Sequence, residues 1–345
     1  MIRRILLAAL ALAPLTILLH YVASPGGTWE FVLAAVALVP LAWLIGEATE
    51  HAAEHTGPGV GGFLNATFGN APELIIALIA VNEGLTAVVR GSLIGSVIGN
   101  LVLVLGFSLL LGGKGEVNRG SSFVSLALVG FALALFLIPA VPGWSGDPER
   151  GSLAGLSIPV SVALLAVYVL VTSRSLRRHR AAHEGADPAI ESWSFRAALL
   201  ALAVATVLTA FVAEILVGSL EAFAEKAHLS HFFVAAVIVA IVGNAAEHGG
   251  AVVVAARGKI ALAAEIALAS SAQVAVFLIP AVALLAWLID PIALSFRPVE
   301  LGALGTAAAV TALVLRDGRS SRPRGVALLI AYAAIAVAFG IAGDR

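Results

Sequence analysis

The segment Gly69-Asn70-Ala71-Pro72-Glu73 recurs 174 residues later as Gly243-Asn244-Ala245-Ala246-Glu247. Each copy opens a long apolar run, so each copy places a glutamate inside a stretch of chain that is otherwise hydrophobic. A carboxylate deep in a bilayer is costly, by several kcal/mol on the low estimates, and such residues are usually functional. The repeated segment therefore predicts both a membrane fold and the place of its site.

The composition around the two copies is that of a protein embedded in lipid. Of the 345 residues, 60% are hydrophobic and only 12% are charged, and the mean hydropathy is +1.03. So few charges cannot cover the surface of a soluble domain, which excludes a cytosolic enzyme, a nucleic-acid-binding protein and a disordered chain. The chain has no cysteine, so it has no disulfides and no thiol chemistry. We expect a lipid bilayer around it, no cofactor and no catalytic residues, while the oligomeric state stays open.

Apolar runs of about 18 residues predict transmembrane helices. Eleven spans are predicted, at residues 5–22, 30–50, 61–81, 91–111, 121–141, 153–173, 196–218, 231–255, 261–285, 299–315 and 326–342. With the N-terminus in the cytoplasm, 15 of the 20 Lys and Arg residues fall on the cytoplasmic side, as the positive-inside rule requires. The prediction is an all-α, multi-pass protein of the plasma membrane, with a cytoplasmic N-terminus and an extracytoplasmic C-terminus.

The surroundings of the two copies match as well, which predicts an internal duplication. Glu47 and Glu221 each precede the first glycine of their copy by 22 residues, and small-residue segments at 95–100 and 269–273 follow at matched distances. The copies lie five spans apart, and because five is odd they have opposite orientations, as in many secondary transporters. The predicted units are an N-terminal helix at 1–26, an inverted five-helix repeat at 27–173, a cytoplasmic linker at 174–195 and a second inverted repeat at 196–345.

Glu73 and Glu247 are predicted to form one shared site for a cation or for protons. Two ionised carboxylates match one divalent cation, and the same pair can hold two protons instead. Oxygen ligands without thiols favour Ca²⁺ over softer metals, and Ca²⁺ takes six to eight oxygens. Helix breaks at the glycines are expected to add backbone carbonyls. The predicted supporting residues are Gly69, Asn70, Ser96, Asn100, Gly243, Asn244, His248, Ser270 and Gln273.

Simpler roles remain open for most of these side chains. Asn70 and Asn244 could cap half-helices, and the serines, Asn100 and Gln273 could serve only to join closely packed helices. His248 is either a proton relay or a structural residue. Three glutamates, Glu47, Glu50 and Glu221, are predicted to line the ion's approach, although solvated helix ends are the alternative, as they are for Glu54 and Glu214. Glu265 has no assigned role.

A different class of protein is suggested by His51-Ala52-Ala53-Glu54-His55. This segment matches the HxxEH pattern of one group of zinc peptidases. Such a site needs a third ligand and a soluble catalytic domain, and the second half of the chain has no matching motif. A membrane zinc hydrolase therefore remains only an alternative.

Three further segments carry a family resemblance. GEATEH at 46–51, GGFLNATFGNAPELIIALIA at 61–80 and GSVIGNLVLVLG at 95–106 resemble the first α-repeat, spanning 61–106, of the Ca²⁺/H⁺ antiporters. These form the CAX family of the cation/Ca²⁺ exchanger superfamily, and residues 242–280 are similar to its second α-repeat. The resemblance implies ten core helices plus an extra first one, with Glu73 and Glu247 as the central Ca²⁺ and H⁺ ligands.

The family resemblance also implies the transport reaction. The expected activity is exchange of cytosolic Ca²⁺, the transported substrate, for protons by alternating access. A Na⁺/Ca²⁺ exchanger of the same superfamily is the nearest alternative. This sequence departs from the family at Pro72, where a β-branched residue is usual, and at Glu265 and Ala269, where glycines are common.

Overall fold

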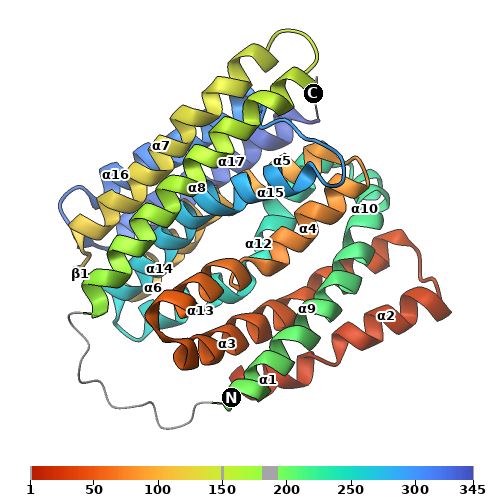
Figure 1. The fold of residues 1–345 in the computed structure, drawn as a ribbon, viewed down its shortest axis with the longest axis horizontal. Coiled ribbons are helices and arrows are strands. Elements are labelled where there is room, and N and C mark those ends of the chain that lie inside the picture. Colours follow the sequence, from red (N-terminus) through yellow and green to blue (C-terminus); the bar gives the residue numbers. More distant parts are fainter. Residues whose placement is uncertain (1, 149–150, 181–192, 345) are drawn as a thin grey trace.

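The computed structural model describes residues 2–148, 151–180 and 193–344, except for the side chains of 2, 57–60, 62–63, 65–66, 174–180, 246 and 247. The chain is built almost entirely from helices packed side by side (Figure 1). Helices predominate because apolar segments in lipid have no water to satisfy their backbone N–H and C=O groups.

Each half of the chain is a series of helices with one very short strand. The first half contains α1 (Ile2–Ala9), α2 (Leu12–Val22), α3 (Gly27–Phe68), α4 (Ala71–Asn82), α5 (Thr86–Ile98), η1 (Gly99–Val104), α6 (Leu105–Gly112), β1 (Gly115–Glu116), α7 (Arg119–Gly143) and α8 (Gly151–Arg180). The second half contains α9 (Phe195–Gly218), α10 (Leu220–Ala227), α11 (His231–Phe233), η2 (Val234–Val239), α12 (Ala240–Gly243), α13 (Ala245–Ala256), α14 (Ile260–Gln273), η3 (Val274–Leu278), α15 (Ile279–Ala286), α16 (Pro298–Leu315), β2 (Arg319–Ser320) and α17 (Arg322–Ala342). The η segments are π-helical.

The multi-pass architecture expected from the sequence is confirmed. In the described part of the chain, nine helices are long and apolar enough to cross a membrane, or up to ten if the pair Leu220–Ala227 and His231–Gly243, bent by 109°, forms one span. Two predicted spans are divided by breaks. The span at 61–81 is shared between α3 and α4, and the span at 231–255 between α11, η2, α12 and α13. The count of eleven therefore stays a prediction.

Several predicted boundaries are wrong. The helix expected at 30–50 continues to Phe68, so residues 51–60 are helical rather than a connection. Helix α8 continues to Arg180, so the predicted linker at 174–195 begins inside a helix, and its residues 181–192 lie outside the described part. A short antiparallel pair, in which Gly115 faces Ser320, joins the connection before α7 to the connection before α17.

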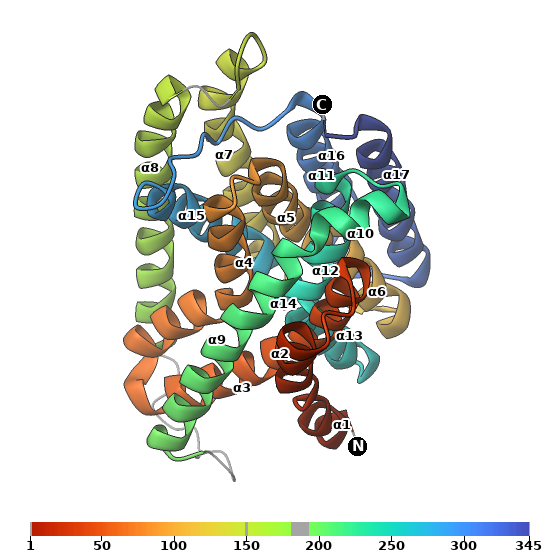
Figure 2. The same ribbon diagram turned by 90° about the vertical axis from the view of Figure 1, so that its right-hand side faces the viewer.

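Two continuous helical segments form the interior of the bundle, and we call them the two interior rods: α5–η1–α6 (Thr86–Gly112) and α14–η3–α15 (Ile260–Ala286). In the most hydrophobic part of each segment, 83% and 67% of the residues are buried, against 50% or less for each of the other spans. Outside them, α3 and α9 pack against each other along much of their length (Figure 2). The buried polar groups on these two segments are therefore shielded from lipid.

The duplication is visible in the backbone. Gly84 (φ +71°) and Gly258 (φ +82°) occupy matching turns before α5 and α14, a conformation that favours glycine. The residues that follow, Leu85 (φ −87°, ψ 62°) and Lys259 (φ −93°, ψ 58°), also match. Segments η1 and η3 begin within one residue of the same offset. The offset of 174 residues, read from Gly69 and Gly243, therefore also relates α5 and η1 to α14 and η3.

The N- and C-terminal residues lie toward opposite ends of the molecule in both views (Figures 1 and 2). One end carries the β1–β2 pair, and a Cβ on Gly115 would lie 3.0 Å from Ile260 at the start of α14. At the other end, the Asp344 carboxylate accepts hydrogen bonds from the backbone N–H groups of His231 (3.1 Å) and Phe232 (2.7 Å). We refer to these as the β1–β2 end and the Asp344 end.

Candidate ion-binding site

The helix breaks fall at the two asparagines of the repeated segment. Asn70 (φ −102°, ψ 18°) separates α3 from α4, and Asn244 (φ −90°, ψ 8°) separates α12 from α13. Neither side chain caps the N-terminus of the helix that follows it, but Asn244 Nδ2 donates to the Ala240 carbonyl of α12, so a capping role at the end of that half-helix stays open for Asn244. Pro72 lies in the first turn of α4, where its missing N–H is tolerated. The breaks thus expose backbone groups in the interior of the bundle.

Amide and hydroxyl groups from the two repeats meet beside these breaks. The Asn244 Nδ2 group donates to Ser96 Oγ (2.8 Å) and to the Ala240 carbonyl (3.0 Å). The Asn100 Nδ2 group donates to Ser270 Oγ (3.0 Å) and to Asn244 Oδ1 (3.4 Å). Four predicted supporting residues, Ser96, Asn100, Asn244 and Ser270, are all buried and form one network. These side chains join closely packed helices, which is the simpler of the two roles considered for them. The network also lies next to the Glu73 side chain, which packs against Gly243.

Glu73 lies in the first turn of α4 and is only 7% exposed. Its Cγ is 3.3 Å from the position that a Cβ on Gly243 would take, so its side chain lies against the break in the other repeat. The positive end of the helix dipole favours a negative charge at this position. Glu247 occupies the equivalent place in the first turn of α13, but its side chain lies outside the described part.

The remaining supporting residues surround this centre. The His248 ring lies against the start of η1, since its Cε1 atom is 3.9 Å from the position of a Cβ on Gly99. Gln273 ends α14, three residues after Ser270, and Gly69 lies in the first break. Among the described side chains, no three His, Cys, Asp or Glu residues come together. The described polar groups beside the second helix break are the amides and hydroxyls of the network, whose oxygens suit a hard cation.

The glutamates predicted along the ion's approach lie at different ends. Glu47 forms an ion pair with Arg3 in α1, with 2.9 Å between Arg3 Nη2 and Glu47 Oε1, and Glu50 is exposed one turn further along α3. Glu221 is exposed on α10, beside Ala222, which packs against Gly27 at the start of α3. At 1.5 Å per residue, the 20 residues from Gly27 to Glu47 span about 30 Å. The three glutamates therefore do not line one path, and their role remains a prediction.

The HxxEH residues contact protein groups instead of forming a metal cluster. His51 stacks on Trp193, with ring centroids 5.0 Å apart, and its Nδ1 lies 3.5 Å from Glu54 Oε2. The His55 Nε2 atom is 2.8 Å from the Trp193 carbonyl oxygen. These contacts attach α3 to the residues just before α9.

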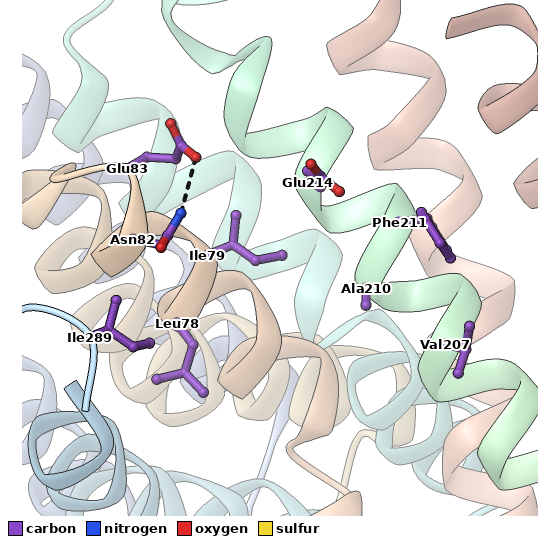
Figure 3. A pocket seen from close by; sticks show the side chains of 9 residues that line it. All are labelled: Leu78, Ile79, Asn82, Glu83, Val207, Ala210, Phe211, Glu214 and Ile289. Atoms are coloured by element: carbon purple, nitrogen blue, oxygen red, sulfur yellow. Dashed lines mark hydrogen bonds between the residues drawn. The ribbon is translucent and has the colours of Figure 1, made fainter. Parts of the chain in front are cut away.

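A cavity of about 460 Å³ lies between α4 and α9, away from the amide network. Figure 3 shows Leu78, Ile79 and Asn82 on the α4 wall and Val207, Ala210 and Phe211 on the α9 wall. Glu83 and Glu214 also line it, and Asn82 Nδ2 donates to Glu83 Oε1 (3.4 Å). Because its walls are mostly apolar, this cavity lacks the converging oxygens of a cation site.

Other polar contacts could not be found by sequence reasoning. Thr311 in α16 donates its hydroxyl to the Leu101 carbonyl (3.1 Å), a backbone group in η1. A π-helix changes the hydrogen-bonding pattern of the carbonyls and is common at functional sites. No sequence motif indicates the π-helix. The hydrogen bond cannot be predicted from the sequence because 210 residues separate Thr311 from Leu101.

The fold and the site define a membrane carrier built from two related halves, and the comparisons give its family. The model of the sodium/calcium exchanger protein family matches residues 26–177 and 197–340, so the chain belongs to this family. The Ca²⁺/H⁺ antiporter of Synechocystis sp. is 37% identical, with 97% of each chain covered. The Ca²⁺/H⁺ antiporter ChaA of Bacillus subtilis is also 37% identical, with 90% of this chain and 91% of the relative covered.

The comparison with solved structures agrees with this family assignment. The Ca²⁺/H⁺ antiporter protein YfkE matches with a TM-score of 0.83 and 34% identity, over 98% of this chain and 99% of that chain. The predicted resemblance to the Ca²⁺/H⁺ antiporters of the exchanger superfamily is confirmed. The alternative of a zinc hydrolase is wrong, since these relatives are transporters rather than enzymes.

Proposed function

We propose that this chain is an antiporter that moves Ca²⁺ out of the cytosol in exchange for protons, by alternating access. The observation that carries the proposal is the position of Glu73, which is buried against the second helix break beside polar groups of both repeats. The names of the bacterial relatives support Ca²⁺ and H⁺ as the ions.

Glu247 completes the site in this proposal. It occupies the same place in α13 that Glu73 occupies in α4, three residues after a non-helical asparagine. When both carboxylates are ionised, they hold one Ca²⁺ together with amide, hydroxyl and carbonyl oxygens. Protonation neutralises the pair and removes its attraction for the cation. Because one site cannot hold both occupants, Ca²⁺ and protons exchange.

We place the protein in the plasma membrane with the β1–β2 end in the cytoplasm. Exposed basic residues at this end support the orientation: Lys114, Arg119, Arg316, Arg319 and Arg322. Cytoplasmic loops carry the excess of Lys and Arg in membrane proteins. The N-terminal helices then begin in the cytoplasm, and Asp344 lies outside. Protons that enter down their gradient drive Ca²⁺ outward.

Flux measurements with purified protein in liposomes test the proposal. Vesicles made acidic inside, without Na⁺, should accumulate Ca²⁺, and a protonophore should abolish the uptake. Uptake that occurs only after Na⁺ is loaded inside would instead establish the Na⁺/Ca²⁺ exchanger, which is the alternative coupling within this family. Vesicles containing Glu73→Gln protein serve as the control for leakage.

A further inference from the structure

The two interior rods differ at the positions where they should match. By the offset of 174 residues, Gly91 of α5 corresponds to Glu265 of α14, and Gly95 corresponds to Ala269. The matching turns at Gly84 and Gly258 fix this correspondence in the backbone as well as in the sequence. A glycine and a glutamate therefore occupy the same place in two helices that start in the same way.

On α5 this face is sealed. A Cβ on Gly91 would lie 2.9 Å from the Phe232 carbonyl oxygen, and a Cβ on Gly95 would overlap the Ala236 carbonyl. Both glycines are buried, and the backbones of α5 and η2 touch with no room for a side chain. Access to the amide network along this face of α5, from the Asp344 end, is closed.

Charged groups hold the sealed face together. Glu300 at the start of α16 is fully buried, and both the backbone N–H (3.1 Å) and the Nε of Arg297 donate to it. Arg90, next to Gly91, lies 3.7 Å from the same carboxylate. The Arg297 guanidinium also covers the Phe232 ring, 4.2 Å from its centroid.

On α14 the matching face is open. Glu265 and Ala269 are both exposed, and Leu262, one turn before Glu265, is 46% exposed. This face runs from the β1–β2 end toward Ser270 and Gln273, which lie at the level of the amide network. A carboxylate on it is more stable in water than in lipid. The structure therefore has its open face toward the β1–β2 end.

We propose that Glu265 keeps this path open by its size, acting as a gating residue for the exchange. The inference rests on the proposed function. In the state closed at the β1–β2 end, we expect the residue of α14 that corresponds to Gly91 to pack against a neighbouring backbone, as Gly91 does on α5. That residue is Glu265. A glutamate at that position cannot enter such a contact. The state open to the β1–β2 end is thus favoured, which is the state in which the protein takes up cytosolic Ca²⁺.

Cysteine accessibility tests this directly, because the native chain has no cysteine. Ala269→Cys is labelled with a membrane-impermeant maleimide applied at the β1–β2 end, in proteoliposomes. In this background Glu265→Gly should lower the labelling rate by about fivefold or more, and Glu265→Ala should lower it less. Glu265→Gln keeps the size without the charge and should label like the parent. Lys114→Cys, exposed at the same end, reports unchanged reagent access and correct insertion.

The outcomes are decisive for the gating role. Equal labelling in the Gly, Ala and Gln variants would overturn it, and a fall with Glu265→Gln would show that charge, not size, is responsible. Slower labelling of Lys114→Cys in the Gly variant would point to misfolding, and the Ala variant, which preserves helix propensity, then decides the question. The labelling reaction requires no ion transport. The gating role can therefore be tested even if the protein is coupled to Na⁺ instead of protons.

Discussion

Asn100 of the first repeat donates a hydrogen bond of 3.0 Å to Ser270 of the second repeat, 170 residues further along the chain. Asn244 of the second repeat donates a hydrogen bond of 2.8 Å to Ser96 of the first repeat. Each bond thus joins an asparagine of one repeat to a serine of the other. The break at Asn244 is thereby tied to α5, and Glu73 lies beside it, with its Cγ 3.3 Å from the position of a Cβ on Gly243.

The carboxylates are expected to be indispensable for exchange. Glu73→Gln and Glu247→Gln each remove one charge and one strong ligand with little change in volume. Each variant should lose Ca²⁺ uptake while it keeps the elution volume and melting temperature of the native protein. Normal uptake by either variant would contradict the assignment of a shared site. Glu83→Gln, an exposed glutamate on the cavity between α4 and α9, is the matched control.

The close contact between α5 and η2 predicts a strong effect of a single methyl group. Gly95→Ala should separate the two backbones, because its Cβ has no space beside Ala236. We expect a destabilisation of about 1–3 kcal/mol, typical of overpacking, and reduced transport. Gly130→Ala in α7, where nothing lies within 4 Å of the added Cβ, should be neutral or slightly stabilising. Equal thermal stability of the two variants in detergent would refute this contact.

The buried carboxylate at the Asp344 end makes another prediction. Arg297→Met should leave Glu300 without its main cationic partner and destabilise the protein by about 3–5 kcal/mol. Adding Glu300→Gln should restore much of this loss, since the uncompensated charge is removed. Thermal unfolding of the single and double variants provides the measurement. A double variant no more stable than Arg297→Met would show that the ion pair is not the cause.

The features that depend on pattern can be predicted from the sequence. Apolar runs predict the membrane helices, and the repeated segment predicts where two of them break. Ser96 and Ser270 follow the breaks at matched distances, which marks them in the sequence, and the structure brings both into one network with Asn100 and Asn244. These features are local or periodic, so one sequence contains them.

Other features depend on which helices meet in space. Nothing in the sequence indicates that Thr311 satisfies a carbonyl of η1, or that His51 stacks on Trp193. The helical continuation of α3 through Gly57 and Pro58 contradicts the usual interpretation of these residues as helix-breaking signals. The difference between the sealed face of α5 and the open face of α14 is a property of one conformational state. The repeat does not predict this difference, because it pairs Gly91 with Glu265 and Gly95 with Ala269 without indicating which of the two faces another helix covers.

Protons released on Ca²⁺ binding measure the central claim, that both ions share Glu73 and Glu247, most directly. Calorimetric titration of Ca²⁺ into purified protein, in buffers of different ionisation enthalpy, gives the number of protons released. A shared site predicts weaker binding as the pH falls, and a release that approaches two protons per Ca²⁺ once the pH lies below the range in which the carboxylate pair ionises. Tight Ca²⁺ binding without proton release throughout that range would contradict a shared site.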